Sequence, residues 1–171
     1  KLRNEAVLPL SITGYSAAGR VIAKDETITD LQVGDCVACA GAKYASHAKV
    51  ISAPRNLVAS VPPNVSLKSA AFTTLGAIAM QGIRRAGVQI GETVVVVGLG
   101  LIGQLTCQLL RVAGCRGIGL DLTEERVELA QRIGLERGIV PGEEDVLKVV
   151  KSFTHGVGAD AVLLCAGTSS S

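Results

Sequence analysis

GETVVVVGLGLIGQLTCQLL, residues 91–110, changes its pattern halfway along. The segment TVVVV (93–97) carries a β-branched side chain at every position, which is typical of a strand buried on both faces. After a group of glycines, apolar residues recur at three- and four-residue spacing as far as Val112, and this period predicts a helix. The glycines therefore lie at a turn between a buried strand and a helix.

The turn carries Gly98, Gly100 and Gly103 in the spacing GxGxxG. In a dinucleotide site the first glycine permits the tight turn, the second lets the backbone approach a pyrophosphate, and the third lets helix and strand pack closely. The N–H groups of Leu101 and Ile102 would then meet the pyrophosphate at the helix N-terminus. Because glycine turns without a nucleotide also show this spacing, its context matters.

An acid after the next strand supplies that context. The segment GIGLD (117–121) is predicted to be a strand, and Asp121 follows Gly103 by 18 residues. A carboxylate there can accept hydrogen bonds from the two hydroxyls of an adenosine ribose, and it would repel a 2′-phosphate. We therefore expect NAD(H) rather than NADP(H), although Arg126, one helical turn further on, could cover the adenine or weaken that preference.

Strand and helix patterns alternate from residue 91 onward. Strands are expected at 93–97, 117–121, 138–140 and 159–167. Helices are expected from the glycine turn to Gly114, after Thr123, and at 143–153. Thr123 is expected to cap the second helix. This β-α-β-α-β-α-β order predicts an α/β fold, a Rossmann-type parallel sheet with helices on both faces. Ala166 would lie at the carboxyl edge of that sheet, where ligands bind, and is a candidate cofactor contact.

The region before residue 66 has short alternating segments divided by turn residues, which predict a small β-rich unit. These segments are AGRVIA (18–23), GDCVACA (34–40) and SHAKVIS (46–52). The Ala-rich segment 66–87 follows and predicts a helix that Ser66 or Ser69 could cap and that could break near Gly76.

Composition narrows the classes of partner. The chain has 17 Lys and Arg against 15 Asp and Glu, and these charges are scattered, so nucleic acid is not expected as a partner. An aromatic content of 2% gives few stacking platforms for single strands. No apolar run approaches the roughly 20 residues that cross a bilayer, so membrane insertion is not expected.

The cysteines indicate a reducing compartment, and we expect the cytoplasm, because five is an odd number for a disulfide framework. Cys36 and Cys39 form a CxxC motif within a predicted strand, where this spacing puts the two thiols on opposite faces. We interpret them as packing residues rather than as a metal or redox pair.

With these residues in view, the chain resembles the medium-chain dehydrogenase/reductase superfamily, which includes zinc alcohol dehydrogenases and quinone reductases. The similar segments are GYSAAGRV (14–21), VGDCV (33–37), YASHAKV (44–50) on to Val61-Pro62, AAFTTLGAIAMQGI (70–83), GETVVVVGLGLIG (91–103), the acid at 121, and GADAVLLCAG (158–167). The resemblance implies that residues 1–66 are part of a GroES-like β-rich domain with the substrate site. Residues 67–171 would then be part of a Rossmann NAD(P)-binding domain.

The resemblance also implies a longer protein, because relatives have a longer N-terminal region and two further strands. The wording GYSAAGR and LGAIAMQG is most similar to zinc-less bacterial members in which the dehydrogenase half precedes a second oxidoreductase domain. A small-molecule substrate is implied, and a homodimer or a fused partner domain in the full-length protein.

Zinc is where the chain departs from the family. Zinc-dependent members carry Gly-His-Glu, with the His as a ligand, where this chain has Gly14, Tyr15 and Ser16. Neither Tyr nor Ser is a usual zinc ligand, and the four-cysteine lobe that holds a structural zinc is missing, so no zinc is expected. Tyr15, at the former ligand position, becomes the candidate proton donor. The alternative is a packed tyrosine whose hydroxyl bonds to backbone.

Three functions remain after these observations. The first is an NAD(H)-dependent, zinc-independent oxidoreductase that transfers a hydride between nicotinamide and an alcohol or carbonyl substrate. The second is an NADPH-dependent quinone or enone reductase. Asp121 disfavours this function, because its carboxylate would repel the 2′-phosphate of NADPH. The third is a non-catalytic dinucleotide-binding module of a larger fused protein.

Overall fold

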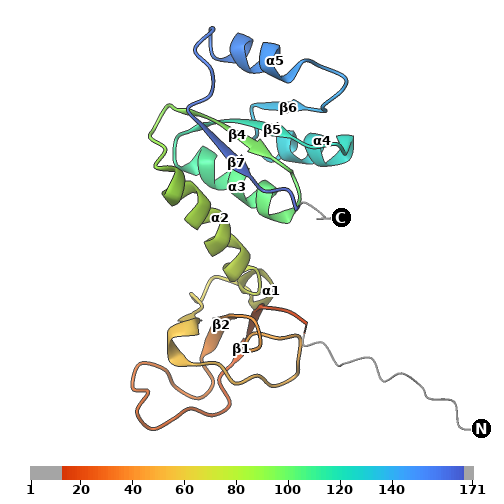
Figure 1. Cartoon of the computed structure of the whole chain (residues 1–171). Coiled ribbons are helices and arrows are strands. Elements are labelled where there is room, and N and C mark those ends of the chain that lie inside the picture. Colours follow the sequence, from red (N-terminus) through yellow and green to blue (C-terminus); the bar gives the residue numbers. More distant parts are fainter. Residues whose placement is uncertain (1–12, 168–171) are drawn as a thin grey trace, which may run out of the picture. The chain divides into compact units, whose positions relative to one another are not determined.

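A three-stranded antiparallel sheet forms the first part of the computed structural model, which describes residues 13–167 (Figure 1). The strand order is β1-β2-β3, with β1 at Ser16–Arg20, β2 at Cys36–Ala40 and β3 at Val58–Ser60. A 3-10 helix, η1 (Arg55–Leu57), leads into β3. Residues on one face of β2, Val37 and Cys39, join Leu31 and Ala45 in a small core.

The segment 46–52 was expected to be a strand and forms none. Its alternation arises because Ile51 packs against the core of the first sheet, together with Ala53, without joining the ladder. The third strand is β3 instead, which pairs antiparallel with β2.

The Ala-rich segment forms two helices, α1 (Leu67–Ala70) and α2 (Thr73–Ala86). The expected cap is present, since the Ser66 hydroxyl accepts a hydrogen bond from the backbone N–H of Ser69. The break expected near Gly76 is wrong, because that residue lies within α2. The chain turns just after α1, where the Thr73 hydroxyl binds the carbonyl of Ala70 at 2.7 Å.

Two units divide the chain, one ending at Thr74 and the other beginning at Leu75. This division falls later than the expected change of domain at residue 66, and α1 accounts for the difference. Helix α1 contacts both β1 and β2, and the Ser16 hydroxyl donates a hydrogen bond of 2.6 Å to the carbonyl of Ala71. The start of the Ala-rich segment thus packs with the first sheet.

The second unit holds a four-stranded parallel sheet in the order β6-β5-β4-β7, which confirms the predicted α/β architecture. Its strands are β4 (Thr93–Val97), β5 (Arg116–Leu120), β6 (Arg137–Ile139) and β7 (Ala161–Leu164). Its connecting helices are α3 (Leu101–Val112), α4 (Glu124–Arg132) and α5 (Val146–Phe153).

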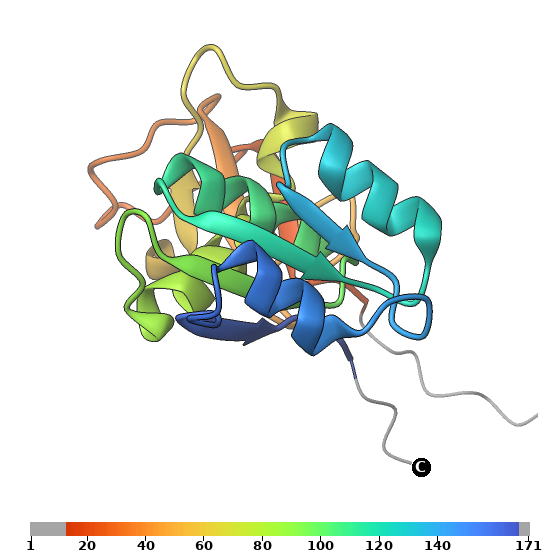
Figure 2. The same cartoon turned by 90° about the horizontal axis from the view of Figure 1, so that it is seen from above.

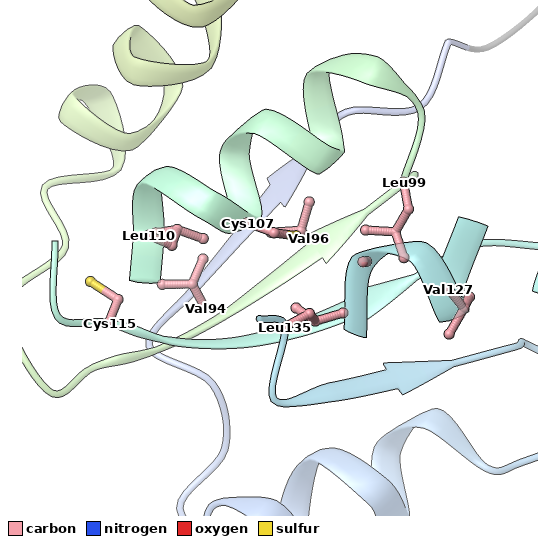
Figure 3. Packing of buried hydrophobic residues seen from close by; sticks show 9 residues of the cluster. Val94, Val96, Leu99, Cys107, Leu110, Cys115, Val127 and Leu135 are labelled. Atoms are coloured by element: carbon pink, nitrogen blue, oxygen red, sulfur yellow. The ribbon is translucent and has the colours of Figure 1, made fainter. Parts of the chain in front are cut away.

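Helices cover both faces of this sheet. Figures 1 and 2 show α3 and α4 on one side and α5 on the other. Val94 and Val96 of β4 pack with α3 and α4, as Figure 3 shows, while the alternate residue Val95 lies in the cluster that α5 covers. The continuous valine run is thus explained by burial on two faces.

Two glycines of β5 make room for leucines above the sheet. A Cβ at Gly119 would lie 2.9 Å from Leu99 Cδ2 and 2.7 Å from Leu135 Cδ2. Leu99, the residue between the first two glycines of the turn, is fully buried. The turn is therefore anchored on β5 as well as on β4.

Strand β7 lies at the edge of the sheet, and within residues 13–167 it pairs only with β4. Its outward side chains Val162 and Leu164 are 58% and 79% exposed. No helix within those same residues has the length and apolar character to cross a membrane.

Candidate dinucleotide-binding site

Each glycine of the turn has its own structural role. Gly98 has φ +92, and a Cβ there would lie 2.7 Å from the backbone nitrogen of Ala166. A Cβ on Gly103 would lie 1.9 Å from the carbonyl oxygen of Gly98, so helix and turn could not approach as they do. A Cβ on Gly100 would meet nothing within 4 Å. Packing therefore requires the first and third glycines, whereas the second borders open space.

Backbone donors are available where α3 begins. Gly100 is the N-cap and offers no side chain, and the first bond of the helical ladder runs from the N–H of Gln104 to the Gly100 carbonyl. The N–H groups of Leu101, Ile102 and Gly103 precede that bond. Together with the positive end of the helix dipole they suit an anion.

An open cleft of about 460 Å³ lies at the carboxyl ends of β4, β5 and β7. Five of the expected residues line it, namely Gly98, Gly100, Asp121, Arg126 and Ala166. Leu101, Ile102 and Gly103 belong to the adjoining first turn of α3 rather than to the lining. The cleft also has apolar walls from Leu122 and Pro141, which sequence reasoning did not single out.

Asp121 is a buried carboxylate that holds backbone on two sides. Its Oδ2 accepts a hydrogen bond of 2.7 Å from the N–H of Leu99, and its Oδ1 accepts one of 2.9 Å from the N–H of Thr123. Arg126 Nη1 lies 3.5 Å from Oδ2. Burial acts to raise the pKa of Asp121, but the two N–H donors and the Arg126 charge outweigh it and hold that pKa below its ordinary value.

Asp121 is therefore ionised at neutral pH and faces the cleft. Each carboxylate oxygen can accept more than one hydrogen bond, so each still has a lone pair for a hydroxyl of a ribose. Thr123 occupies the N-cap of α4 as expected, but its side chain makes no capping bond. Its backbone N–H donates to Asp121, and the N–H of Arg126 in the first turn of α4 donates to the Thr123 carbonyl.

Gln104 is the residue that sequence reasoning missed. It lies among the buried residues of α3, and its Nε2 donates to the carbonyls of Leu99 and Arg126. No local sequence pattern singles it out, because it does not lie on the apolar series that ends at Val112.

Tyr15 directly precedes β1 in the first unit. Its side chain is 43% exposed, and its carbonyl accepts a hydrogen bond of 2.9 Å from the N–H of Gly41. The ring of His47 covers the preceding Gly14, where a Cβ would lie 2.4 Å from His47 Cδ2. The exposure leaves the phenol open to a ligand, and its role as a proton donor stays a prediction.

The five cysteines are free thiols in the described residues. Cys39 is buried, and burial, with a smaller contribution from Cys165, raises the pKa of Cys107 to about 12. Within residues 13–167 no three His, Cys, Asp or Glu side chains gather as they would around a metal ion.

Known protein families and solved structures share this arrangement of strands and helices. Residues 102–171 match a family model described as zinc-binding dehydrogenase. Over 156 residues the chain is 36% identical to D-guloside 3-dehydrogenase of Shigella flexneri, which covers 90% of this chain and 44% of that protein. This chain belongs to the medium-chain dehydrogenase/reductase superfamily. It spans about half the length of the curated relatives that it matches.

Two solved structures of this superfamily extend the comparison. A quinone oxidoreductase of Pseudomonas syringae has a TM-score of 0.73 at 29% identity, over 87% of this chain and 47% of that one. A mycobacterial protein in complex with NADPH has a TM-score of 0.76 at 28% identity, over 87% and 48%. The medium-chain fold therefore covers both units of the chain, and its relatives are dehydrogenases and oxidoreductases.

Proposed function

We propose that this chain is part of a zinc-independent oxidoreductase that binds NAD(H) in the cleft and transfers a hydride between nicotinamide and an alcohol or carbonyl substrate. The observation that carries the proposal is the ionised Asp121 at the cleft wall, one residue beyond β5. The likeness to a relative named D-guloside 3-dehydrogenase supports a dehydrogenase reaction on a small molecule.

The residues present fit a dinucleotide. The open space beside Gly100 admits a close approach of a pyrophosphate, and the N–H groups of Leu101 and Ile102 are placed to bind it. Asp121 would bind the adenosine ribose, and Ala166 is small enough to leave the cleft open. Nicotinamide, when bound, supplies the hydride chemistry, and the protein supplies binding and orientation.

Titration of the protein with NADH and with NADPH tests the cofactor. We expect NADH to bind at least about tenfold more tightly, because a 2′-phosphate would face a buried carboxylate. In Asp121→Asn the ratio of the two dissociation constants should fall toward one. In the control Glu125→Gln, an exposed change in the first turn of the neighbouring helix α4, the ratio should stay as in the wild type. Tighter binding of NADPH by the wild type would refute the choice of NAD(H).

NADPH-dependent reduction of a quinone or enone is the second candidate. Two features favour it: the likeness to a quinone oxidoreductase and to a protein solved with NADPH, and the 56% exposed side chain of Arg126 beside the cleft. If Arg126 receives a 2′-phosphate, Arg126→Gln should weaken NADPH binding and leave NADH binding unchanged. An equal effect on both cofactors would count against this candidate.

Turnover by the full-length protein separates both enzymes from a non-catalytic module. Binding of NADH without turnover over a panel of alcohols, aldehydes, quinones and enones would favour the module. Turnover that survives chelators, in protein without stoichiometric zinc by elemental analysis, is expected for the proposed enzyme.

We propose Tyr15 as the proton donor of the reaction, since its exposed phenol stands at the position where zinc-dependent members of the family carry a metal ligand. Tyr15→Phe in the full-length protein should lower kcat at least about tenfold, within the range of general acid catalysis, and leave NADH binding unchanged. Tyr44→Phe is the matched control, because Tyr44 is the other tyrosine and is 45% exposed in the same unit. Unchanged turnover by Tyr15→Phe would rule out this role.

The proposal includes a cytoplasmic location, and a homodimer or a fused partner domain in the full-length protein. Sedimentation of that protein distinguishes a dimer from a monomer.

A further inference from the structure

Gln104 is a buried amide on the inner face of α3. It is 8% exposed, and its neighbours on that face are Gly103, Thr106, Cys107 and Leu110. Its Oε1 has no hydrogen-bond partner among the described residues. An apolar side chain of the same length would avoid the cost of burying that oxygen. The contribution of Gln104 therefore lies in the hydrogen bonds of its Nε2 group.

Those bonds join two parts of the cofactor cleft. Nε2 donates to the carbonyl of Leu99 at 3.0 Å and to the carbonyl of Arg126 at 2.8 Å. Leu99 belongs to the glycine turn, and Arg126 belongs to the first turn of α4. Since both acceptors are carbonyls, the nitrogen must face them and an oxygen in that place would be repelled.

Asp121 makes the complementary pair of bonds. It accepts from the N–H of Leu99 and from the N–H of Thr123, the N-cap of α4. The two polar groups of the buried Leu99 residue are thus each held by a side chain that also holds the start of α4. The glycine turn and α4 are fixed relative to each other by this double connection.

We propose that Gln104 is a positioning residue for the dinucleotide. It sets the separation between the glycine turn, which binds the pyrophosphate, and the start of α4 beside Asp121, where the adenosine ribose binds. Gln104 does not line the cleft, so it acts only through the backbone of Leu99 and Arg126. This inference rests on the proposed binding of NAD(H).

Ligands of two lengths distinguish positioning from a general contribution to stability. NADH must occupy the pyrophosphate and ribose positions together, so its affinity depends on the distance between them. Adenosine occupies only the ribose position. A change in that distance therefore weakens NADH and leaves adenosine nearly unaffected.

Gln104→Met tests the proposal, since it keeps the length of the side chain and removes both bonds. We expect NADH to bind about tenfold more weakly, as the loss of two ordinary hydrogen bonds allows, and adenosine to bind as in the wild type. Gln108→Met is the matched control. Gln108 lies one turn further along α3, is exposed, and donates only to the carbonyl of Gln104. It should change neither affinity.

The outcomes separate this inference from the proposed function. Wild-type protein that does not bind NADH overturns both. Wild-type binding that Gln104→Met leaves unchanged, or weakens equally for NADH and adenosine, overturns only the role of Gln104.

Should Gln104→Met not fold, Gln104→Glu measured over pH serves instead. A protonated glutamic acid can donate one of the two bonds, so the preference for NADH over adenosine should rise as pH falls. A preference that does not vary with pH would overturn the proposal.

Discussion

The glycines of the turn differ in what a methyl group would do. Gly100→Ala should leave the free energy of unfolding within about 0.5 kcal/mol of the wild type, because its φ of −68° suits alanine and the added Cβ meets no atom. It should weaken NADH binding at least about tenfold, since that Cβ enters the cleft. Urea unfolding and NADH titration measure the two effects.

Gly103→Ala should do the reverse and destabilise the protein by about 3 kcal/mol, because its Cβ would overlap the carbonyl of Gly98. A pair of variants with equal stability losses would show that the turn is not packed as described.

Asp121 gives a pH dependence whose sign follows from its lowered pKa. Its two N–H partners stabilise the folded protein while it is ionised, so this contribution is complete above the unfolded pKa of 3.8 and is lost as pH falls through the lower folded pKa. Asp121→Asn should be about 2 kcal/mol less stable at neutral pH. The gap to the wild type should close below pH 3.8. A gap that is constant in acid would contradict the assigned bonds.

The sequence predicted the residues of the site that follow a motif, and it missed those that depend on packing. Asp121 and the three glycines have fixed spacings, so they could be found without a structure. Gln104 could not, because its importance lies in two carbonyls, of which one belongs to a residue 22 positions away. Side-chain bonds of that kind depend on how α3 and α4 pack, which no local pattern contains.

Helix caps provide a prediction at the scale of elements. The Asp145 side chain caps α5 by accepting from the N–H of Lys148 at 3.2 Å, so Asp145→Ala should cost about 1 kcal/mol of unfolding free energy. Thr123→Ala should cost less than about 0.5 kcal/mol, because the Thr123 side chain makes no capping bond in α4. Urea unfolding of both variants gives the comparison.

Asp145 also forms an ion pair with Lys148, and Lys148→Met controls for it. This variant keeps the backbone cap and removes the pair, so its stability should stay within about 0.5 kcal/mol of the wild type. A loss equal to that of Asp145→Ala would assign the effect to the ion pair.

Elements with a long and regular period were predicted well, as was the short strand β6, whereas the short elements of the first unit were not. The strands β4 and β5 and the helix α3 lie where the local patterns placed them. The buried face of α3 is not the expected one, however, because Val112 is 86% exposed and Thr106, Cys107 and Leu110 are buried instead. The segment 46–52 alternates without pairing, and β3 has only three residues. In such short segments the partner strand determines the structure, and the sequence alone does not name the partner.

At the scale of the whole chain, the open edge of β7 predicts self-association of the isolated residues 1–171. Within residues 13–167 the outer edge of β7 has no partner strand, and Val162 and Leu164 are exposed on the face of the sheet where Val95 lies. Edge strands with exposed apolar side chains pair readily with other copies. Val162→Lys should therefore reduce concentration-dependent association in sedimentation velocity. Val157→Lys is the control, because Val157 is 86% exposed but lies in the loop before β7. Equal effects of both variants would assign the change to net charge instead of the edge.

The α/β architecture could be foreseen from the order of patterns, and so could the family, because the segments that carry the resemblance are spread over both units. The position of α1 could not. Its residues have helical propensity, but its contacts with β1 and β2 decide that α1 packs with the first unit.

The buried Leu99 peptide also makes a site-specific spectroscopic signal available. Leu99 is fully buried, and its amide proton is donated to the Asp121 carboxylate. Exchange of this proton with deuterium therefore requires the turn to open. Since the same turn would close around a bound dinucleotide, cofactor should slow the exchange of this one proton more than that of the Leu110 amide deep in α3. One resonance would then report both the integrity of the turn and the occupancy of the cleft.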